Sequence, residues 1–329
     1  MKLKVTMGCW DYDRVRSIMD GTVPVQGVDL NFLNMPVEET FFRQLRYREF
    51  DVAEMSLSSY TMSLFTPEKP FIAIPVFPSR FFRHSCIYVN ANSGIKTAKD
   101  LIGKKVGNPE YQMTAPAWIR GILSDYYGVP ADSVSYFIGG EEETGRSEKL
   151  KLNLPPNFRV EPIGPTQTLS QMLLDGEIDA LYTARTPSSF LKGDGKVVRL
   201  FPNHVAVEKQ YFKETGIFPI MHVIAIRRDF YEQNRWVAMS LFKAFKEAQR
   251  QLYEDMSQTA ALKGMLPWFN AHVEEAKQEM GEDFWPYGYS KNEKVIDTFL
   301  RYHYEQGLSK HQLRASEIFA PETMESFKI

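Results

Sequence analysis

Cysteine is nearly absent from this sequence of 329 residues, which holds only Cys9 and Cys86. Two cysteines cannot build a disulfide framework, and neither belongs to a CxxC pair of the kind that binds structural zinc. Phosphate-loop chemistry is missing too, because the pair Gly139-Gly140 is not followed by GK[ST]. The sequence therefore predicts no cofactor and gives no support for a metal, although a metal site made of scattered His and Glu side chains cannot be read from spacing.

Long apolar runs are also lacking. No stretch reaches the ~18 uninterrupted apolar residues that span a bilayer. The start, MKLKVTMGCWDYDR, has neither the apolar core nor the small-residue cleavage site of a secretory signal. We therefore expect a protein that stays in the cytoplasm and has no membrane partner.

An excess of charge of either sign is the third missing feature. Lys and Arg number 39 and Asp and Glu 41, so the net charge is -2 and there is no broad basic face for a phosphate backbone. Nucleic acid is not expected as a partner, whereas a homo-oligomer is compatible with the sequence. The length suits two domains, and the 13% of aromatic residues suits packing around a small ligand.

The pattern of apolar residues predicts alternating strands and helices. Strands are expected at 2–7, 28–33, 51–55 and 71–77, separated by helices, and again at 101–107, 134–138 and 178–182. An amphipathic helix is expected over 234–255. Residues 139–157 are charged and contain Gly and Pro, which predicts an exposed excursion without chemistry.

A short motif that occurs twice in the sequence indicates two lobes with the same topology. A helix followed by Arg48-Glu49-Phe50-Asp51-Val52-Ala53 and a Ser-rich turn recurs as a helix followed by Gly176-Glu177-Ile178-Asp179-Ala180-Leu181 and Tyr182-Thr183-Ala184-Arg185. Coincidence is the alternative for so short a match. Open parallel sheets bind ligands beyond the carboxyl ends of their strands, so two such lobes predict a ligand cleft between them.

This plan resembles the type II periplasmic-binding-protein fold, an α/β architecture with two lobes, each a mainly parallel sheet flanked by helices. The resemblance places residues 1–86 and 223–329 in the first lobe, with a helical C-terminal part, and residues 87–222 in the second. A closer resemblance, to the 4,5-dihydroxyphthalate decarboxylase family, runs from Met1 to Ile329. It is carried by the segments VEETFFRQLRYREFDVAEMSLSSY, IPVFPSRFFRHSCIYVN, GNPEYQMTAPAWIRGIL, VEPIGPTQTL, TGIFPIMH and FAPETMESFKI. It implies non-oxidative loss of one carboxylate from a dihydroxylated phthalate, giving protocatechuate and carbon dioxide.

Arginines are the natural candidates to bind an aromatic dicarboxylate. Arg80 and Arg83 directly follow the expected strand 71–77, and a guanidinium matches a carboxylate with two hydrogen bonds. Arg185 follows the strand that ends near Tyr182. The alternative for each is a solvated surface charge.

Polar residues at predicted helix starts form a second group of candidates, because free backbone N–H groups there attract anions. Helix capping is the competing explanation for them, and core packing for two aromatic residues after the first strand. The proposed substrate-binding residues of this kind are Ser58, Ser59, Tyr111, Gln112 and Thr114. Thr183, which follows an expected strand, and the aromatic residues Trp10 and Tyr12 complete the set.

The proton donor is expected among His84, His222 and Glu110. Both histidines fall near the inferred lobe crossings, where an imidazole could exchange a proton near neutral pH. A hinge histidine bonded to backbone is the structural alternative, and Glu110 would need burial to raise its pKa. Cys9 has no visible His or Asp partner in the sequence, so a nucleophilic role is disfavoured.

These residues lead to one mechanism and two rivals. We expect an arginine to bind one carboxylate while an acid protonates the ring carbon that bears the second carboxylate. No electron-sink cofactor is then needed. The first rival is a cytoplasmic binding protein or sensor that closes on an aromatic carboxylate without altering it. The second, an enzyme of thiamine-precursor type, would need a reactive His or Cys cluster.

Overall fold

The computed structural model describes residues 1–324 and divides the chain into two compact units. Of the described residues, the first unit holds 1–80, 222–296 and 314–324, and the second holds 81–221 and 297–313. Residues 325–329, which end the segment FAPETMESFKI, lie outside the described residues. No helix within residues 1–324 is both long and apolar enough to cross a membrane.

The first unit is built on a five-stranded sheet with the order β2-β1-β3-β11-β4. Its strands are β1 (Leu3–Cys9), β2 (Val28–Asn34), β3 (Val52–Ser56), β4 (Phe71–Ile74) and β11 (His222–Arg227). Its helices are α1 (Arg16–Met19), α2 (Val37–Tyr47), α3 (Leu57–Ser63), α8 (Arg228–Gln233), α9 (Trp236–Met256) and α10 (Phe269–Met280), and α11 (Glu293–Glu305) begins in it.

Strand direction brings several ends to one edge of this sheet. β1 runs parallel to β2 and β3, whereas β11 runs antiparallel to both β3 and β4. The first residue of β11, His222, therefore lies at the edge where β1 and β3 end. All five residues of β3 are buried, because this strand is central and covered on both faces.

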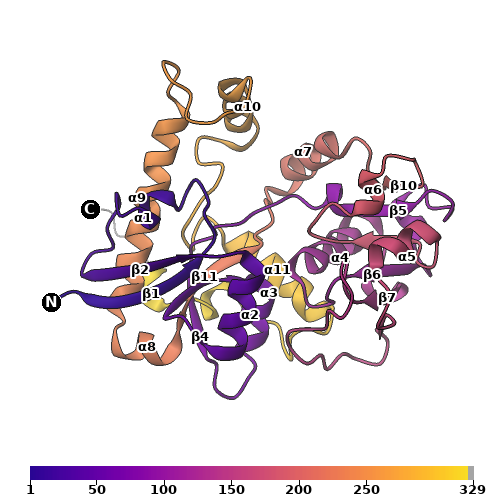
Figure 1. The fold of residues 1–329 in the computed structure, drawn as a ribbon, viewed down its shortest axis with the longest axis horizontal. Helices are drawn as coiled ribbons and strands as arrows, with labels where there is room; N and C mark the ends of the chain where they lie inside the picture. The colour runs from indigo at the N-terminus through magenta and orange to yellow at the C-terminus, as the bar shows by residue number, and fades with distance from the viewer. Residues whose placement is uncertain (325–329) are drawn as a thin grey trace. The chain divides into compact units, whose positions relative to one another are not determined.

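The helix α3 begins directly after β3. The Ser56 side chain caps it by accepting a hydrogen bond from the Ser59 backbone N–H at 3.5 Å. Farther along the chain, the 21-residue helix α9 leads away from the sheet to α10, which has no buried residue (Figure 1).

The second unit is built on a six-stranded sheet with the order β10-β5-β9-β6-β7-β8. Its strands are β5 (Ile87–Asn90), β6 (Lys105–Asn108), β7 (Ser135–Ile138), β8 (Arg159–Pro162), β9 (Ala180–Tyr182) and β10 (Val197–Arg199). Its helices are α4 (Thr114–Tyr127), α5 (Leu169–Asp175), α6 (Ser188–Leu191) and α7 (His204–Thr215). β9, β6, β7 and β8 are parallel, whereas β5 and β10 pair in the antiparallel sense.

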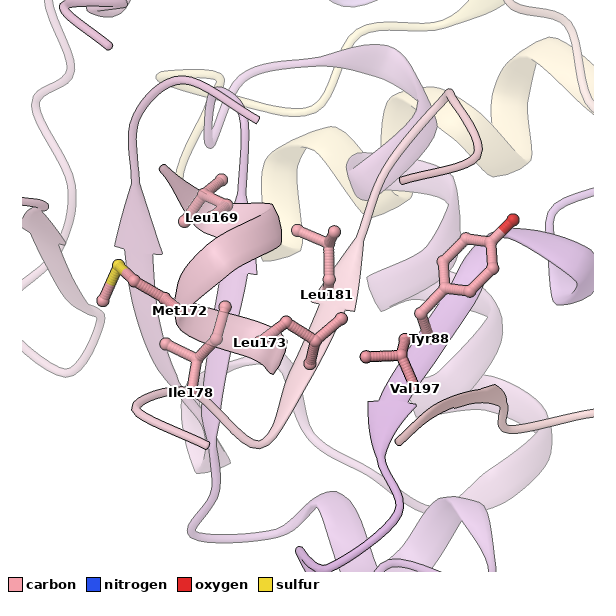
Figure 2. Close-up of a cluster of buried hydrophobic side chains, with 7 residues drawn as sticks. All are labelled: Tyr88, Leu169, Met172, Leu173, Ile178, Leu181 and Val197. Carbon is pink, nitrogen blue, oxygen red and sulfur yellow. The ribbon is translucent and has the colours of Figure 1, made fainter. Parts of the chain in front are cut away.

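One face of the second sheet carries an apolar cluster (Figure 2). The helix α5 packs Leu169 and Leu173 toward Leu181 of β9, while Tyr88 and Val197 extend the cluster along β5 and β10. Gly107 lies under this helix, and a Cβ there would meet the Ile178 side chain at 2.7 Å. The sequence of β6 thus needs glycine for the close approach of α5.

The predicted elements are present with shifted bounds. Gly103 adopts a left-handed φ of 78°, so the strand expected at 101–107 begins only at Lys105. The strand expected at 71–77 ends at Ile74, because Pro75 has no N–H to continue the ladder. Both sheets contain antiparallel strands, so they are mixed.

The division into lobes at 1–86 with 223–329 and at 87–222 stays a prediction. The contact-defined units differ from it mainly at residues 297–313, which pack with the second unit. The reason lies in α11: Phe299 and Tyr302 contact the ring of Trp118 on α4, at centroid distances of 5.4 and 5.7 Å.

Candidate active site

A buried carboxylate lies in the middle of the first sheet. Glu54 is the third residue of β3, between the apolar residues Ala53 and Met55, and its side chain is fully buried. Removing a carboxylate from water is costly unless hydrogen bonds or a cation compensate. The partners of Glu54 therefore indicate what this position is for.

The sheet register brings two polar side chains beside Glu54. In the antiparallel pair, Ile224 lies opposite Glu54, so His222 is the diagonal neighbour on the same face. In the parallel pair, Gly8 lies opposite Ala53, which places Cys9 next to Glu54. Three strands from distant parts of the chain thus meet at one carboxylate.

Four donors surround the two carboxylate oxygens. Oε1 is 2.6 Å from His222 Nδ1 and accepts a hydrogen bond of 2.6 Å from the Tyr12 hydroxyl. Oε2 accepts from the Trp10 backbone N–H at 3.1 Å and from the Cys9 thiol at 3.6 Å. Both oxygens are satisfied, so the buried charge is compensated.

These contacts fix the protonation states of the group. Burial raises the pKa of Glu54, but the hydrogen bond and charge of His222, with help from Tyr12, outweigh it and leave the pKa below its usual value. Burial, followed by the Glu54 charge, raises the pKa of both Tyr12 and Cys9. Glu54 is therefore a carboxylate, Tyr12 a phenol, and Cys9 a weakly nucleophilic thiol.

The imidazole of His222 is held on one side and accessible on the other. Phe41 contacts it edge to face, with ring centroids 4.8 Å apart, and Nδ1 faces Glu54. Its side chain is 17% exposed, and no residue among 1–324 hydrogen-bonds Nε2. Such an imidazole can move a proton through Nε2 while the carboxylate stabilises its charged form.

The sequence predicted His222, Tyr12 and Trp10 for the site but missed Glu54. A charged residue inside the buried strand Val52–Ser56 was the available signal, because an unpaired carboxylate is rare in a central strand. The absence of a visible partner for Cys9 was also misleading, since that partner is Glu54.

Arg80 lies in the first unit, and its guanidinium forms hydrogen bonds within that unit. It is buried and donates to the Pro286 carbonyl at 2.7 Å and to the Asn292 side chain. Burial lowers its pKa to about 9, so it stays charged at neutral pH. Its predicted role as a substrate ligand stays a prediction.

Arg83 lies in the second unit and has unusual partners. It is buried, its Nε donates to the Met221 sulfur at 3.1 Å, and its Nη1 donates to the Cys86 sulfur at 3.5 Å. Sulfur is a weak acceptor, and no carboxylate among residues 1–324 forms an ion pair with this guanidinium. A buried cation held in this way is suited to an anionic ligand.

His84 is enclosed by aromatic rings in the second unit. It contacts Tyr127, Phe201 and Tyr211 at centroid distances of 5.3 to 5.8 Å, and neither ring nitrogen has a hydrogen-bond partner among residues 1–324. Burial lowers its pKa to about 4. The ring is therefore neutral near pH 7, which makes His222 the better candidate for the proton donor.

The enclosure of His84 has a consequence for stability. The unfolded chain binds a proton at His84 below about pH 6.5 and the folded chain only below about pH 4, so stability falls as the pH falls through this window. We expect up to about 3 kcal/mol of this loss to disappear in His84→Phe. Urea unfolding from pH 4 to 8 measures it, with the exposed His272→Gln as control; equal slopes in H84F and wild type would contradict it.

Glu110 forms a buried ion-pair cluster in the second unit. It lies 2.6 Å from Nη2 of Arg146 and also binds the Lys149 ammonium. The neighbouring Glu148 accepts from the Tyr111 backbone N–H, and burial, followed by the Glu110 charge, raises its pKa to about 7. The segment 139–157 is irregular and mostly exposed or half-buried, as predicted, but Arg146 and Lys149 within it neutralise the buried Glu110, so it is not without a role.

The other predicted residues of the second unit lie near this cluster or near β9. Tyr111, Gln112 and Thr114 are buried around the start of α4. Thr183 is buried and donates to Glu141, whose pKa is raised by burial. The backbone N–H of the exposed Arg185 donates to the Thr183 hydroxyl at 3.1 Å.

In the first unit, Ser58 and Ser59 are buried in the first turn of α3, beside the end of β3. Trp10 is 41% exposed, and its contribution to the Glu54 cluster is its backbone N–H. The structure thus brings together Trp10, Tyr12 and His222 among the predicted residues of this unit. The substrate-binding roles of all these side chains stay predictions.

Comparison with solved structures identifies the type of fold. The chain superposes on the periplasmic sulfonate-binding protein SsuA from Methylobacillus flagellatus with a TM-score of 0.58 and 14% identity, over 98% of this chain and 92% of that one. This confirms the predicted α/β architecture of the periplasmic-binding-protein type. At this identity the likeness concerns the fold alone.

Comparison with characterised sequences is more specific, although no protein-family model matches the chain. The 4,5-dihydroxyphthalate decarboxylase from Comamonas testosteroni is 40% identical over 328 residues, covering all of this chain and 99% of that protein. The enzyme of the same name from Pseudomonas putida is 43% identical over 212 residues, covering 64% of this chain and 82% of that protein. With such identity along its whole length, and as the sequence motifs predicted, the chain belongs to the 4,5-dihydroxyphthalate decarboxylase family.

Proposed function

We propose that this chain removes one carboxylate from 4,5-dihydroxyphthalate without oxidation, giving protocatechuate and carbon dioxide. Its family membership supports this reaction, and one structural observation supports the mechanism. His222 has Nδ1 on the buried Glu54 carboxylate and Nε2 without a partner among residues 1–324. This is the arrangement that a general acid requires.

The chemistry needs one proton at a ring carbon. His222 donates it from Nε2 to the carbon that carries the departing carboxylate, and a new C–H bond forms from the ring π electrons. The hydroxyl para to that carbon stabilises the cationic ring. The bond to the carboxylate then breaks, its electron pair restores the aromatic ring, and carbon dioxide leaves. Water returns the proton to His222.

Glu54 and Tyr12 prepare the imidazole for this step. The Glu54 carboxylate stabilises the imidazolium and fixes the ring through Nδ1. The Tyr12 hydroxyl donates to the same oxygen and lies 3.5 Å from Nδ1, so it limits rotation of both partners. The Cys9 thiol fills the space beside Oε2 and takes no covalent role, because its pKa is raised.

Among the predicted arginines, Arg83 differs in that its acceptors are sulfur atoms, and its role as a substrate ligand stays a prediction. A cytoplasmic location and a homo-oligomeric state remain expectations from the sequence. A sensor of aromatic acids remains the rival function, which the fold of the binding proteins favours only weakly.

The reaction itself is tested by incubating the purified protein with 4,5-dihydroxyphthalate in deuterium oxide. We expect protocatechuate that carries one deuterium at the vacated ring carbon, because the proton of His222 exchanges with solvent. Product is followed by liquid chromatography and mass spectrometry. Tight binding of the dicarboxylate with no product would favour the sensor and reject the proposed function.

A further inference from the structure

Arg14 is a rigidly held cation beside the Glu54 cluster that the sequence did not single out. It follows β1 in the same loop as Tyr12, and its guanidinium carbon lies 4.3 Å from the centre of the Tyr12 ring and 4.2 Å from that of Trp285. Its Nε donates to the Pro78 carbonyl at 2.6 Å, and Trp285 Nε1 donates to the Phe77 carbonyl at 2.9 Å. The Pro78 carbonyl and the two rings fix the orientation of the guanidinium before any ligand binds, and the Phe77 carbonyl in turn fixes Trp285.

The guanidinium of Arg14 forms one ion pair, which is weak. Its Nη1 is 3.0 Å from Asp13, whose side chain is 52% exposed, and such a surface pair contributes little. Nη2 has no hydrogen-bond partner among residues 1–324, although the Arg14 side chain is only 15% exposed. A pre-oriented guanidinium with a free N–H edge is a ready partner for a carboxylate.

Tyr12 connects this cation to the proton donor. One face of its ring contacts Arg14, and its hydroxyl binds Glu54 and lies 3.5 Å from His222 Nδ1. The guanidinium and the imidazole thus both contact Tyr12, the first at the face of its ring and the second near its hydroxyl, so the cation and the proton donor belong to one cluster. Arg80 is less suited, because Pro286 and Asn292 already accept from its guanidinium.

We propose that Arg14 binds the carboxylate that the substrate retains, while the adjacent carboxylate lies before Nε2 of His222. This inference rests on the proposed function and names the residue that selects ortho-dicarboxylates. It also explains why only one carboxylate is removed from each substrate molecule. The single carboxylate of protocatechuate is bound by Arg14, so the ring carbon before His222 carries hydrogen.

The test compares binding of protocatechuate with binding of its neutral amide, 3,4-dihydroxybenzamide. Wild-type protein should bind the carboxylate roughly tenfold or more tightly, as expected for a charge-assisted hydrogen bond. In Arg14→Gln the ratio of the two dissociation constants should approach one, and in Arg14→Lys it should be partly restored. Arg16→Gln is the matched control, because Arg16 is an exposed arginine at the start of α1 that pairs with Asp11.

Activity provides the second measurement. We expect Arg14→Gln to raise KM for 4,5-dihydroxyphthalate roughly tenfold or more and Arg14→Lys to raise it less. If the wild-type protein forms protocatechuate but either Arg14 variant keeps the wild-type ratio of the two dissociation constants, the role of Arg14 is overturned and the proposed function is not. A wild-type protein that forms no protocatechuate would instead reject the proposed function. A loss of folding in Arg14→Gln leaves the Arg14→Lys ratio to decide.

Discussion

Replacing His222 with glutamine lowers kcat for 4,5-dihydroxyphthalate by about 100- to 10,000-fold, the usual contribution of a general acid. Glutamine can still donate a hydrogen bond to Glu54, so the buried carboxylate keeps a partner and the sheet is preserved. It cannot deliver a proton to carbon. KM should change little, because His222 acts mainly in the transition state. Steady-state rates of protocatechuate formation measure both constants.

The matched control for this variant is His84→Gln. His84 lies among aromatic rings in the second unit, and its pKa of about 4 leaves it neutral at the pH of the assay. We expect its kcat to stay within a fewfold of wild type for the protein that remains folded. If both variants kept full turnover, the histidine mechanism would fail. If only His84→Gln lost activity, the donor would be His84.

The fold could be predicted from the sequence because its signals are local. The apolar run Phe71–Ile74 and the apolar residues of Val52–Ser56 identify strands, and the Ser-rich turn after β3 identifies the start of α3. Bounds were less certain, since Gly103 and Pro75 shift two strand ends through backbone geometry. The antiparallel direction of β11 could not be read locally, because it depends on how the chain returns from the second unit.

The candidate site was only partly predictable for the same reason. His222 and Tyr12 were selected by their positions near strand ends, but 168 residues separate Glu54 from His222. Only the strand register makes these two side chains neighbours. Arg14 was missed because the ring of Trp285, which helps to hold it, comes from a loop far along the chain. Long-range pairing of this kind leaves no pattern in a single sequence.

The charged segment 139–157 shows a different limit, in which composition predicted the exposed, irregular backbone but not the few side chains that pair with buried groups. Gly, Pro and many charges are typical of exposed loops, and they predicted one here. Most of the segment is exposed or half-buried, but Arg146 and Lys149 neutralise the buried Glu110, and Glu141 accepts a hydrogen bond from the Thr183 hydroxyl. A charge in a loop is hidden when its partner lies in a buried position elsewhere.

Replacing Glu54 with glutamine is expected to cost about 100-fold or more in kcat, although Glu54 contacts no substrate. The carboxylate stabilises the imidazolium form of His222, and a neutral amide cannot replace that charge. Without this negative charge the protonated imidazole loses its compensating partner, so the pH range of highest activity should move to lower pH. This shift separates an electrostatic role from loss of packing, which would lower activity equally at every pH.

Two further variants complete the argument for Glu54. Glu54→Asp keeps the charge but shortens the side chain by one methylene, so it should lose activity while retaining a pH profile close to that of wild type. Glu39→Gln alters an exposed carboxylate that pairs with Arg43 on α2 and should change neither kcat nor the profile. Rates of protocatechuate formation between pH 5 and 9 compare all three. An unshifted pH profile in Glu54→Gln would mean that the charge of Glu54 does not affect proton transfer by His222. The contact between Glu54 and His222 would then stabilise the fold and have no catalytic role.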